Sequence, residues 1–410
     1  MLMASETFGM EMPGSVGAGA GLQAGLQAGP AELTAHRRPL QALTGIRFFA
    51  AFYVVVFHTR VGQLLNERGW HAAGNFFFNG YLAVPLFFLL SGFILAYTYE
   101  GQIEAKGDHR RFWEARFARI WPVYAVSLLL ESIPSFSFPP LGSALAAICM
   151  VQAWNPFNPG LAGTWNFVCW TLSVEAVFYI VFPWYQTWLE VRRPRTQLLT
   201  IAAMLAVCVA INSASRTLGY KPYGAWRWTP LPIPHLPEFF TGVGLGNCYL
   251  RLLMGKAGKP GADLLPGRGL WTYASLLATV ALLCCPSSRW TGLIVSAFAA
   301  LLFGLAAEKT LLSRFLSSKA MLLGGGISYS IYLVQMPVKS WVQTITERLH
   351  LGNEGLRFLI TATVLIGVSL ILFKAVEDPA RKLLRGVFAR METARTGRAE
   401  DQVQRKRATT

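Results

Sequence analysis

Residues 43–58 read Leu43-Thr-Gly-Ile-Arg-Phe-Phe-Ala-Ala-Phe-Tyr-Val-Val-Val-Phe-His58, an apolar run that carries two ionisable side chains. Its composition predicts a membrane-spanning helix, in which Arg47 and His58 are costly to bury and usually functional. The eleven steps from Arg47 to His58 turn a helix by about 1100°, within about 20° of three full turns. Both side chains therefore share one face, roughly 16 Å apart along the axis. This stripe predicts a polar path into the membrane.

The whole chain is too apolar for an ordinary soluble protein. Of its 410 residues 53% are hydrophobic, and the mean hydropathy is +0.39. Apolar runs of spanning length recur and predict about ten membrane helices. They lie near residues 42–62, 76–99, 120–133, 165–188, 197–213, 235–254, 269–285, 290–307, 323–345 and 355–375. We therefore expect an all-α, polytopic membrane protein.

The net charge of +16 is distributed as in a membrane protein. Lys and Arg fall mainly between the apolar runs and in the carboxyl-terminal tail, which excludes a nucleic-acid-binding role and favours both termini in the cytoplasm. The short run 141–154 breaks the alternation of sides, so we interpret it as a re-entrant or interfacial segment. Residues 214–234 then form the main external loop, whose aromatic residues either line an acceptor groove or anchor the loop at the interface.

Three regions follow from composition. Residues 1–38 are rich in Gly, Ala and Gln and lack the pattern of a signal peptide, which predicts a disordered cytoplasmic leader. Residues 39–382 form the transmembrane domain, and residues 383–410 form a basic cytoplasmic tail. The six cysteines lie in apolar stretches without metal-ligand spacing, so we expect neither a metal site nor a disulfide framework.

The second predicted span contains a small pair, Ser91-Gly92, among large apolar residues. One interpretation is a notch for close helix packing. The other is functional: Ser91 donates a hydrogen bond into a cavity, or Gly92 admits a slender ligand arm.

Arg116 and Arg119 are three residues apart at the entrance to the third span and share a helix face. Positive-inside anchoring explains them without further function. Alternatively, they form a fork for phosphate, because guanidinium groups present paired donors that match phosphate oxygens.

Two carboxylates also fall within predicted spans. Glu175 is expected near mid-membrane, where it needs a partner or becomes protonated; Tyr179, one turn away, can hydrogen-bond to it, and an Arg or His of another helix would pair with it better. Glu238 begins another span and is either structural or functional. Further along, Gly324–Pro337 predicts a packed helix interrupted at Pro337, and Glu377-Asp-Pro379 predicts a capped junction to a basic helix.

Taken together, these segments resemble the acyltransferase 3 family of integral membrane acyltransferases, in the family's order from about residue 40 to 382. The matching pieces are Arg47 with ten residues before His58, Phe87-Phe-Leu-Leu-Ser91-Gly92, Arg116-Phe-Ala-Arg119-Ile-Trp-Pro122, Trp170-Thr-Leu-Ser-Val-Glu175, Pro237-Glu238-Phe-Phe, Ser328-Tyr-Ser-Ile-Tyr332-Leu and Glu377-Asp-Pro379.

The resemblance implies about ten spans in the inner (plasma) membrane and transfer of an acyl group, commonly acetyl, from cytoplasmic acyl-CoA to a hydroxyl of an envelope carbohydrate or glycolipid. Acyl-CoA is then a co-substrate, and no bound cofactor is expected. Glu238 and Tyr332 are further candidate site residues. The chain departs from the family at Gln335, where many relatives carry His.

The mechanism that we expect uses His58 as the base, with Glu175 orienting it or supporting the imidazolium. Arg47, Arg116 and Arg119 would hold the CoA phosphates, and the pantetheine arm would pass Ser91 and Gly92. A transient acyl-His58 is the alternative route. The rival functions are a proton-coupled transporter or flippase that uses the same ionisable residues, and a non-catalytic relative.

Overall fold

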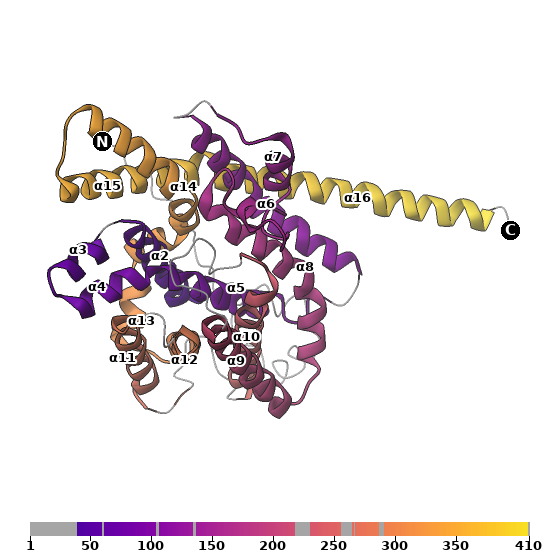
Figure 1. Cartoon of the computed structure of the whole chain (residues 1–410). Coiled ribbons are helices and arrows are strands. Elements are labelled where there is room, and N and C mark those ends of the chain that lie inside the picture. Colours follow the sequence, from indigo (N-terminus) through magenta and orange to yellow (C-terminus); the bar gives the residue numbers. More distant parts are fainter. Residues whose placement is uncertain are drawn as a thin grey trace, which may run out of the picture. The chain divides into compact units, whose positions relative to one another are not determined.

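The computed structural model describes residues 39–59, 61–103, 106–133, 137–217, 230–255, 265, 267–286 and 291–408. All regular structure within these ranges is helical, as the sequence predicts (Figure 1). The expected leader and residues 218–229 of the expected external loop lie outside the described residues.

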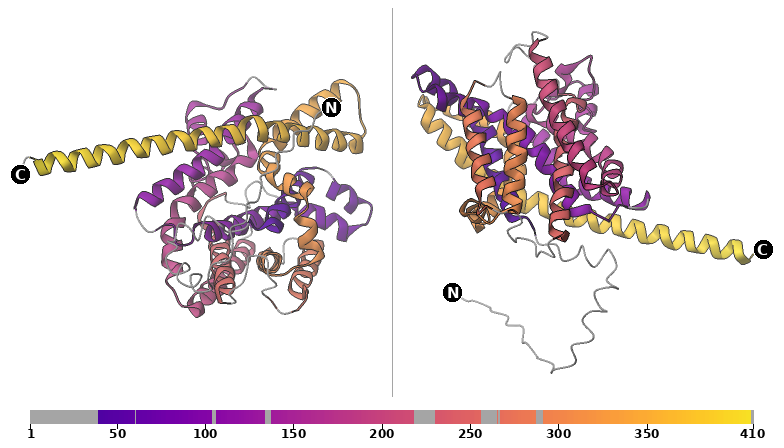
Figure 2. Two further views of the ribbon diagram at one scale, coloured as in Figure 1. Left: turned by 180° about the vertical axis from the view of Figure 1, so that it is seen from behind. Right: turned by 90° about the horizontal axis from the view of Figure 1, so that it is seen from below.

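Ten longer helices carry most of the described chain. They are α2 (Gln41–Phe57), α5 (Ala83–Tyr99), α6 (Lys106–Ser132), α8 (Trp170–Glu190), α9 (Pro194–Thr217), α10 (Leu236–Gly255), α11 (Leu270–Cys284), α12 (Thr291–Ala307), α14 (Lys319–Arg348) and α15 (Glu354–Leu372). The long helix α16 (Asp378–Ala408) follows them, and α3 (Val61–Glu67), α4 (His71–Phe78), α7 (Leu141–Ile148) and α13 (Leu311–Leu316) are short. In Figure 2, α9, α11 and α12 run alongside one another.

Each predicted span coincides with one of the ten longer helices, but fewer pass a test of length and apolar composition. Within the described residues five helical stretches pass: His71–Tyr99, Phe167–Glu190, Pro194–Ile211, Lys319–Arg348 and Glu354–Thr393. A sixth is added if the bent pair α2 and α3 counts as one span. The multispan helical architecture is thus confirmed, whereas the count of ten and the side of each terminus stay predictions.

Small residues bring two pairs of helices into backbone contact. A Cβ added at Gly92 of α5 would lie 2.2 Å from the Phe239 carbonyl oxygen of α10, and one added at Gly242 of α10 would lie 2.0 Å from that of Leu89. Gly325 does the same for α14, where a Cβ would lie 2.0 Å from the Thr44 carbonyl oxygen of α2. Such close approach strengthens dispersion contacts, which drive helix association in membranes.

The predicted interruption at Pro337 is wrong, because α14 continues through it from Lys319 to Arg348. Proline has no N–H and leaves the carbonyl four residues earlier, that of Leu333, without its helical donor. The side-chain amide of Asn166 donates to this Leu333 oxygen at 2.8 Å. A side chain from another segment therefore replaces the lost hydrogen bond, as membrane helices that contain proline require.

Two other segments are irregular according to the sequence: the short run 141–154 and the junction at Glu377-Asp-Pro379. The short run 141–154 contains only the eight residues of α7, which is too short to cross a membrane. The predicted cap at Glu377-Asp-Pro379 is wrong, because a π-helical turn (Phe373–Glu377) joins α15 to α16 without a break, although the predicted basic helix does follow. Single π-helical turns are rare and often lie at functional sites.

Candidate active site

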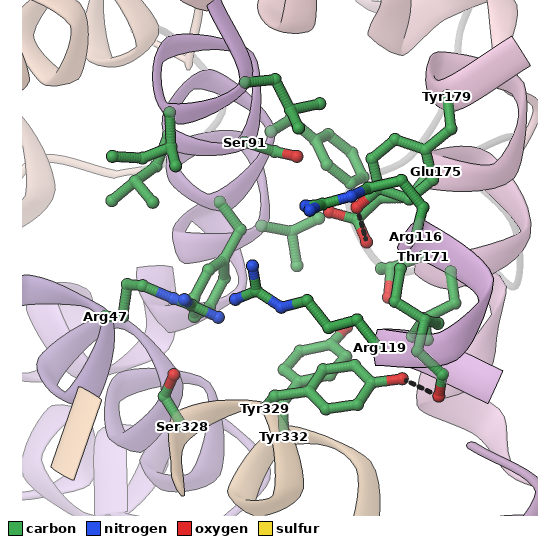
Figure 3. Close-up of a pocket in the computed structure, with 18 residues that line it drawn as sticks. Arg47, Ser91, Arg116, Arg119, Thr171, Glu175, Tyr179, Ser328, Tyr329 and Tyr332 are labelled. Atoms are coloured by element: carbon green, nitrogen blue, oxygen red, sulfur yellow. Dashed lines mark hydrogen bonds between the residues drawn. The ribbon is translucent and has the colours of Figure 1, made fainter. Parts of the chain in front are cut away.

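One cavity gathers most of the predicted site residues. Its empty volume, which includes the open solvent at its mouth, is about 880 Å³. Side chains of α2, α5, α6, α8 and α14 line it (Figure 3). Of the nine predicted site residues, six line this cavity: Arg47, Ser91, Arg116, Arg119, Glu175 and Tyr332. His58, Gly92 and Glu238 lie elsewhere.

Three guanidinium groups converge on this cavity. Arg47 comes from α2, and Arg116 and Arg119 come from successive turns of α6, so that all three point into the same space (Figure 3). Arg116 donates from Nη2 to the Tyr99 hydroxyl at 3.1 Å, and its guanidinium carbon lies 5.4 Å from the centre of the Tyr99 ring. Within the described part of the chain, the buried Nε atoms of Arg47 and Arg116 have no hydrogen-bond partner. Buried donors without partners imply a ligand or ordered water.

Two carboxylates accompany the three arginines. Glu175 of α8 accepts a hydrogen bond from the Tyr179 hydroxyl at 3.3 Å, one helical turn away, which confirms that predicted contact. Glu377, in the π-helical turn, is buried and accepts a long hydrogen bond from Ser330 at 3.5 Å. Among the described residues neither carboxylate lies within 4.0 Å of the three guanidinium groups.

Both carboxylates nevertheless act on the arginines through space. Glu175 interacts electrostatically with Arg47, Arg116 and Arg119, and Glu377 interacts with Arg119 and Arg47. Three positive and two negative charges leave a net positive cluster with donors to spare. This arrangement suits a ligand with several negative charges, because each guanidinium can form charge-assisted hydrogen bonds to phosphate oxygens.

The part of the cavity wall that α5 contributes is mostly apolar. Val84, Phe87, Phe88, Leu90 and Leu95 line it, with Ser91 as the polar exception. The ring of Phe87 meets that of Tyr332 edge to face, with their centroids 6.0 Å apart. An extended ligand with a polyanionic head and a less polar arm would meet matching surfaces along this path.

His58 lies at the end of α2, away from the residues that line the cavity. It is the carboxyl-terminal cap of α2, one residue beyond the last helical position. Its ring packs against Phe57 and Phe167, with centroids 4.9 Å and 6.4 Å away, and its carbonyl oxygen accepts a hydrogen bond from Lys339 Nζ of α14. Among the residues that the structure describes, no hydrogen bond or ion pair joins His58 to Glu175, and the role of Glu175 in supporting His58 stays a prediction.

Glu238 forms a different kind of site with His235, a residue that sequence analysis did not single out. Both are buried, and His235 Nδ1 lies 3.0 Å from Glu238 Oε2. The His235 ring packs against Phe88 at 5.2 Å and Trp170 at 5.7 Å between centroids. The pair is thus packed behind the cavity wall, and its polar atoms satisfy each other.

Sequence analysis also missed Lys339 and Asn166. The signal for Lys339 is present in the sequence, since it is the only Lys, Arg, Asp or Glu between residues 320 and 346. Asn166 offers no such signal, because its role depends on Pro337 of a distant helix. Gln335 is buried and donates to the Tyr332 carbonyl oxygen at 2.8 Å. No group of three or more His, Cys, Asp or Glu in the described ranges could hold a metal ion.

The sequence also matches known proteins. The sequence pattern of the acyltransferase 3 family, described as an acyltransferase domain, matches residues 40–374. The acyltransferase MdmB of Streptomyces mycarofaciens is 32% identical over 223 residues, which cover 50% of this chain and 56% of MdmB.

Two other relatives carry names that state an acetyl group. The O-acetyltransferase OatA of Staphylococcus aureus is 24% identical over 373 residues, covering 84% of this chain and 58% of OatA. The putative peptidoglycan O-acetyltransferase YrhL of Bacillus subtilis is 25% identical over 209 residues, covering 47% of this chain and 30% of YrhL. The matched segments thus span little more than half of MdmB and OatA and less of YrhL. No solved structure matches the chain significantly.

Proposed function

Because this chain belongs to the acyltransferase 3 family, we propose that it is a membrane-bound O-acyltransferase. The donor that we propose is acyl-CoA, with acetyl as the first acyl group to test, since two of the three relatives described above are named O-acetyltransferases. The acceptor that we propose is a hydroxyl of an envelope carbohydrate or glycolipid, and the name of YrhL states peptidoglycan for that protein. Residues 39–382 form the enzyme domain, with ten spans, both termini cytoplasmic and the plasma (inner) membrane as its location.

The observation that carries this proposal is the cluster of Arg47, Arg116 and Arg119 in one cavity, with buried Nε atoms that lack partners. CoA carries several phosphate charges at one end and an uncharged arm at the other. In our proposal the arginines bind the phosphates, and the arm extends past Ser91 along the apolar residues of α5. A single neutral metabolite would leave these donors unpaired at a high cost in free energy.

The acyl group then has to travel along α2 toward His58. Arg47 and His58 are eleven residues apart, or roughly 16 Å along the helix axis. The rings of Phe87 and Tyr332 line the cavity from which this route starts. Movement of a helix cannot bring Arg47 and His58 together, because both belong to α2. We therefore infer that an extended donor arm spans the distance between them.

At His58 the acyl group passes from the sulfur atom of the donor to the oxygen atom of the acceptor. The imidazole takes the proton of the acceptor hydroxyl, the oxygen attacks the thioester carbon, the new C–O bond forms, and the C–S bond breaks. The thiolate leaves with the electron pair and takes up a proton, and His58 then releases the proton of the acceptor to water, so that the imidazole is neutral again. Of the charged groups that line the cavity, Glu175 is the carboxylate, whereas the guanidinium groups of the arginines stay protonated. We therefore assign Glu175 the relay of the thiolate's proton from water, in place of direct support for His58.

The experiment uses membranes that contain the wild type, His58→Ala or His71→Ala, supplied with radiolabelled acetyl-CoA and an envelope glycan extract. His71 is exposed and lies outside the proposed site, so it serves as the matched control. We expect label in glycan for the wild type and the control, and none for His58→Ala. Glycan labelling at the wild-type level by His58→Ala would contradict the assigned base, and failure of the wild type to bind acyl-CoA would contradict the proposed donor.

A further inference from the structure

Lys339 closes the end of α2 at which His58 lies. Its Nζ donates to the carbonyl oxygen of His58, the residue that caps this helix. The last carbonyl groups of a helix lack partners within the helix and carry partial negative charge. An ammonium group donates hydrogen bonds to such carbonyl oxygens, and its positive charge offsets their partial negative charge. Here it comes from α14, 281 residues later in the chain, so the contact fixes the position of His58 relative to the helix that also carries Tyr332.

Lys339 also acts on the imidazole ring itself. It is the charged neighbour that interacts electrostatically with His58. The ring otherwise packs against Phe57 and Phe167. A cation beside a ring in apolar surroundings opposes protonation, since like charges repel and burial removes water from the charged form. From α15, Glu354 faces Lys339 and interacts with it electrostatically.

The position of Lys339 argues against an ordinary surface lysine. Its side chain is half-buried on α14, a helix long and apolar enough to cross a membrane. A charge at such a site costs free energy and is usually retained for function. The hydrogen bond to the end of α2 explains where the Lys339 side chain points, and the electrostatic interaction with His58 explains why a charged residue stands there.

We propose that Lys339 is a positioning residue for His58: it caps α2 and keeps the imidazole in the neutral form that can accept a proton. This inference rests on the proposed role of His58 as the base. It predicts that transfer at mildly acidic pH depends on a residue that touches neither substrate.

Three substitutions separate the two effects. Lys339→Gln keeps a hydrogen-bond donor but removes the charge, Lys339→Met removes both, and Lys339→Arg keeps both. Lys319→Met is the matched control, because Lys319 begins the same helix and is exposed. The full chain in membranes is assayed for acetyl transfer to glycan between pH 3 and 9, with expression checked by immunoblot.

We expect the acid limb of the kcat profile to move to higher pH by about one unit in Lys339→Gln, so that kcat well below the limb falls roughly tenfold. Lys339→Arg and Lys319→Met keep the wild-type limb. A uniform fall of kcat at every pH in Lys339→Gln, with the limb unmoved, would overturn the inference. If Lys339→Met does not accumulate, the Gln and Arg variants still decide the question.

The same experiment distinguishes this inference from the proposed function. His58→Ala is assayed in parallel across the same pH range. If it transfers acetyl like the wild type, then the base assignment is wrong, and Lys339 has no base to position. If it is inactive while the Lys339→Gln profile superimposes on that of the wild type, then only the inference about Lys339 is wrong.

Discussion

Glu175 and Glu238 are both carboxylates held in apolar helices, and they differ in how their surroundings satisfy them. Glu238 lies 3.0 Å from His235, and both side chains are buried behind aromatic rings. Glu175 instead faces a cavity with three arginines, none of them within ion-pair distance in the described structure, and two of these arginines have buried Nε atoms without partners. A carboxylate paired with a buried neighbour, such as Glu238, stabilises the fold, whereas the unsatisfied arginine donors around Glu175 imply a ligand.

The sharpest test of this comparison is Glu175→Gln. The amide keeps the size of the side chain but no longer exchanges a proton, so we expect kcat to fall about 100-fold while KM for acyl-CoA changes little. Steady-state transfer from acetyl-CoA measures both constants. If Glu175→Gln lowers thermal stability and leaves kcat per folded molecule unchanged, then Glu175, like Glu238, is structural.

Arg119→Ala removes one of the proposed phosphate ligands. A hydrogen bond to a charged group contributes about 2 kcal/mol, which predicts a rise of roughly 30-fold in KM for acetyl-CoA. Acetyl-pantetheine lacks the nucleotide phosphates, so its KM should not change. Arg111→Ala is the control on the same helix, since the Arg111 side chain is 61% exposed. A similar rise in KM for both donors would contradict phosphate binding.

Glu238→Ala tests the other side of the comparison. It leaves the buried His235 without this acceptor, and we expect a loss of about 1–3 kcal/mol in stability. Thermal unfolding in detergent should then begin at a lower temperature, while kcat per folded molecule stays near the wild-type value. A fall in kcat at unchanged stability would move Glu238 into the catalytic group.

The neighbours Ser91 and Gly92 give the smallest and most local test. Gly92→Ala would press a methyl group against the α10 backbone, 2.2 Å from the Phe239 carbonyl oxygen, and overpacking of this kind costs about 1–3 kcal/mol. Ser91→Ala removes a polar group from the cavity wall without a clash. We expect the first to lower stability and the second to raise KM for acyl-CoA a few-fold. The opposite pattern would place the ligand arm on Gly92.

Much of the site could be predicted from the sequence because charged residues are rare in apolar helices. Arg47, Arg116, Arg119 and Glu175 stand out against their neighbours, and each has a position in the family's order of motifs. The same reasoning placed Glu238 beside them, because a linear pattern does not tell whether a buried carboxylate has a partner. The hydrogen bond from His235 decides that point, and it depends on how the chain enters α10.

Other features depended on contacts between distant segments. Pro337 predicts a break in a helix read by itself, yet the amide of Asn166 satisfies the carbonyl group that the proline leaves free. Helical periodicity places Arg47 and His58 on one face of α2, but only the packing of α5, α6, α8 and α14 shows that the cavity includes Arg47 and not His58.

The sequence by itself determined the helical membrane architecture, the family and the set of rare ionisable residues, because hydropathy and motif order are properties of the linear chain. The tertiary structure decided which of those residues face one cavity and that Lys339 lies against the end of α2. These outcomes depend on contacts between residues far apart in sequence, such as the 281 positions that separate His58 from Lys339, and local pattern carries no information about them.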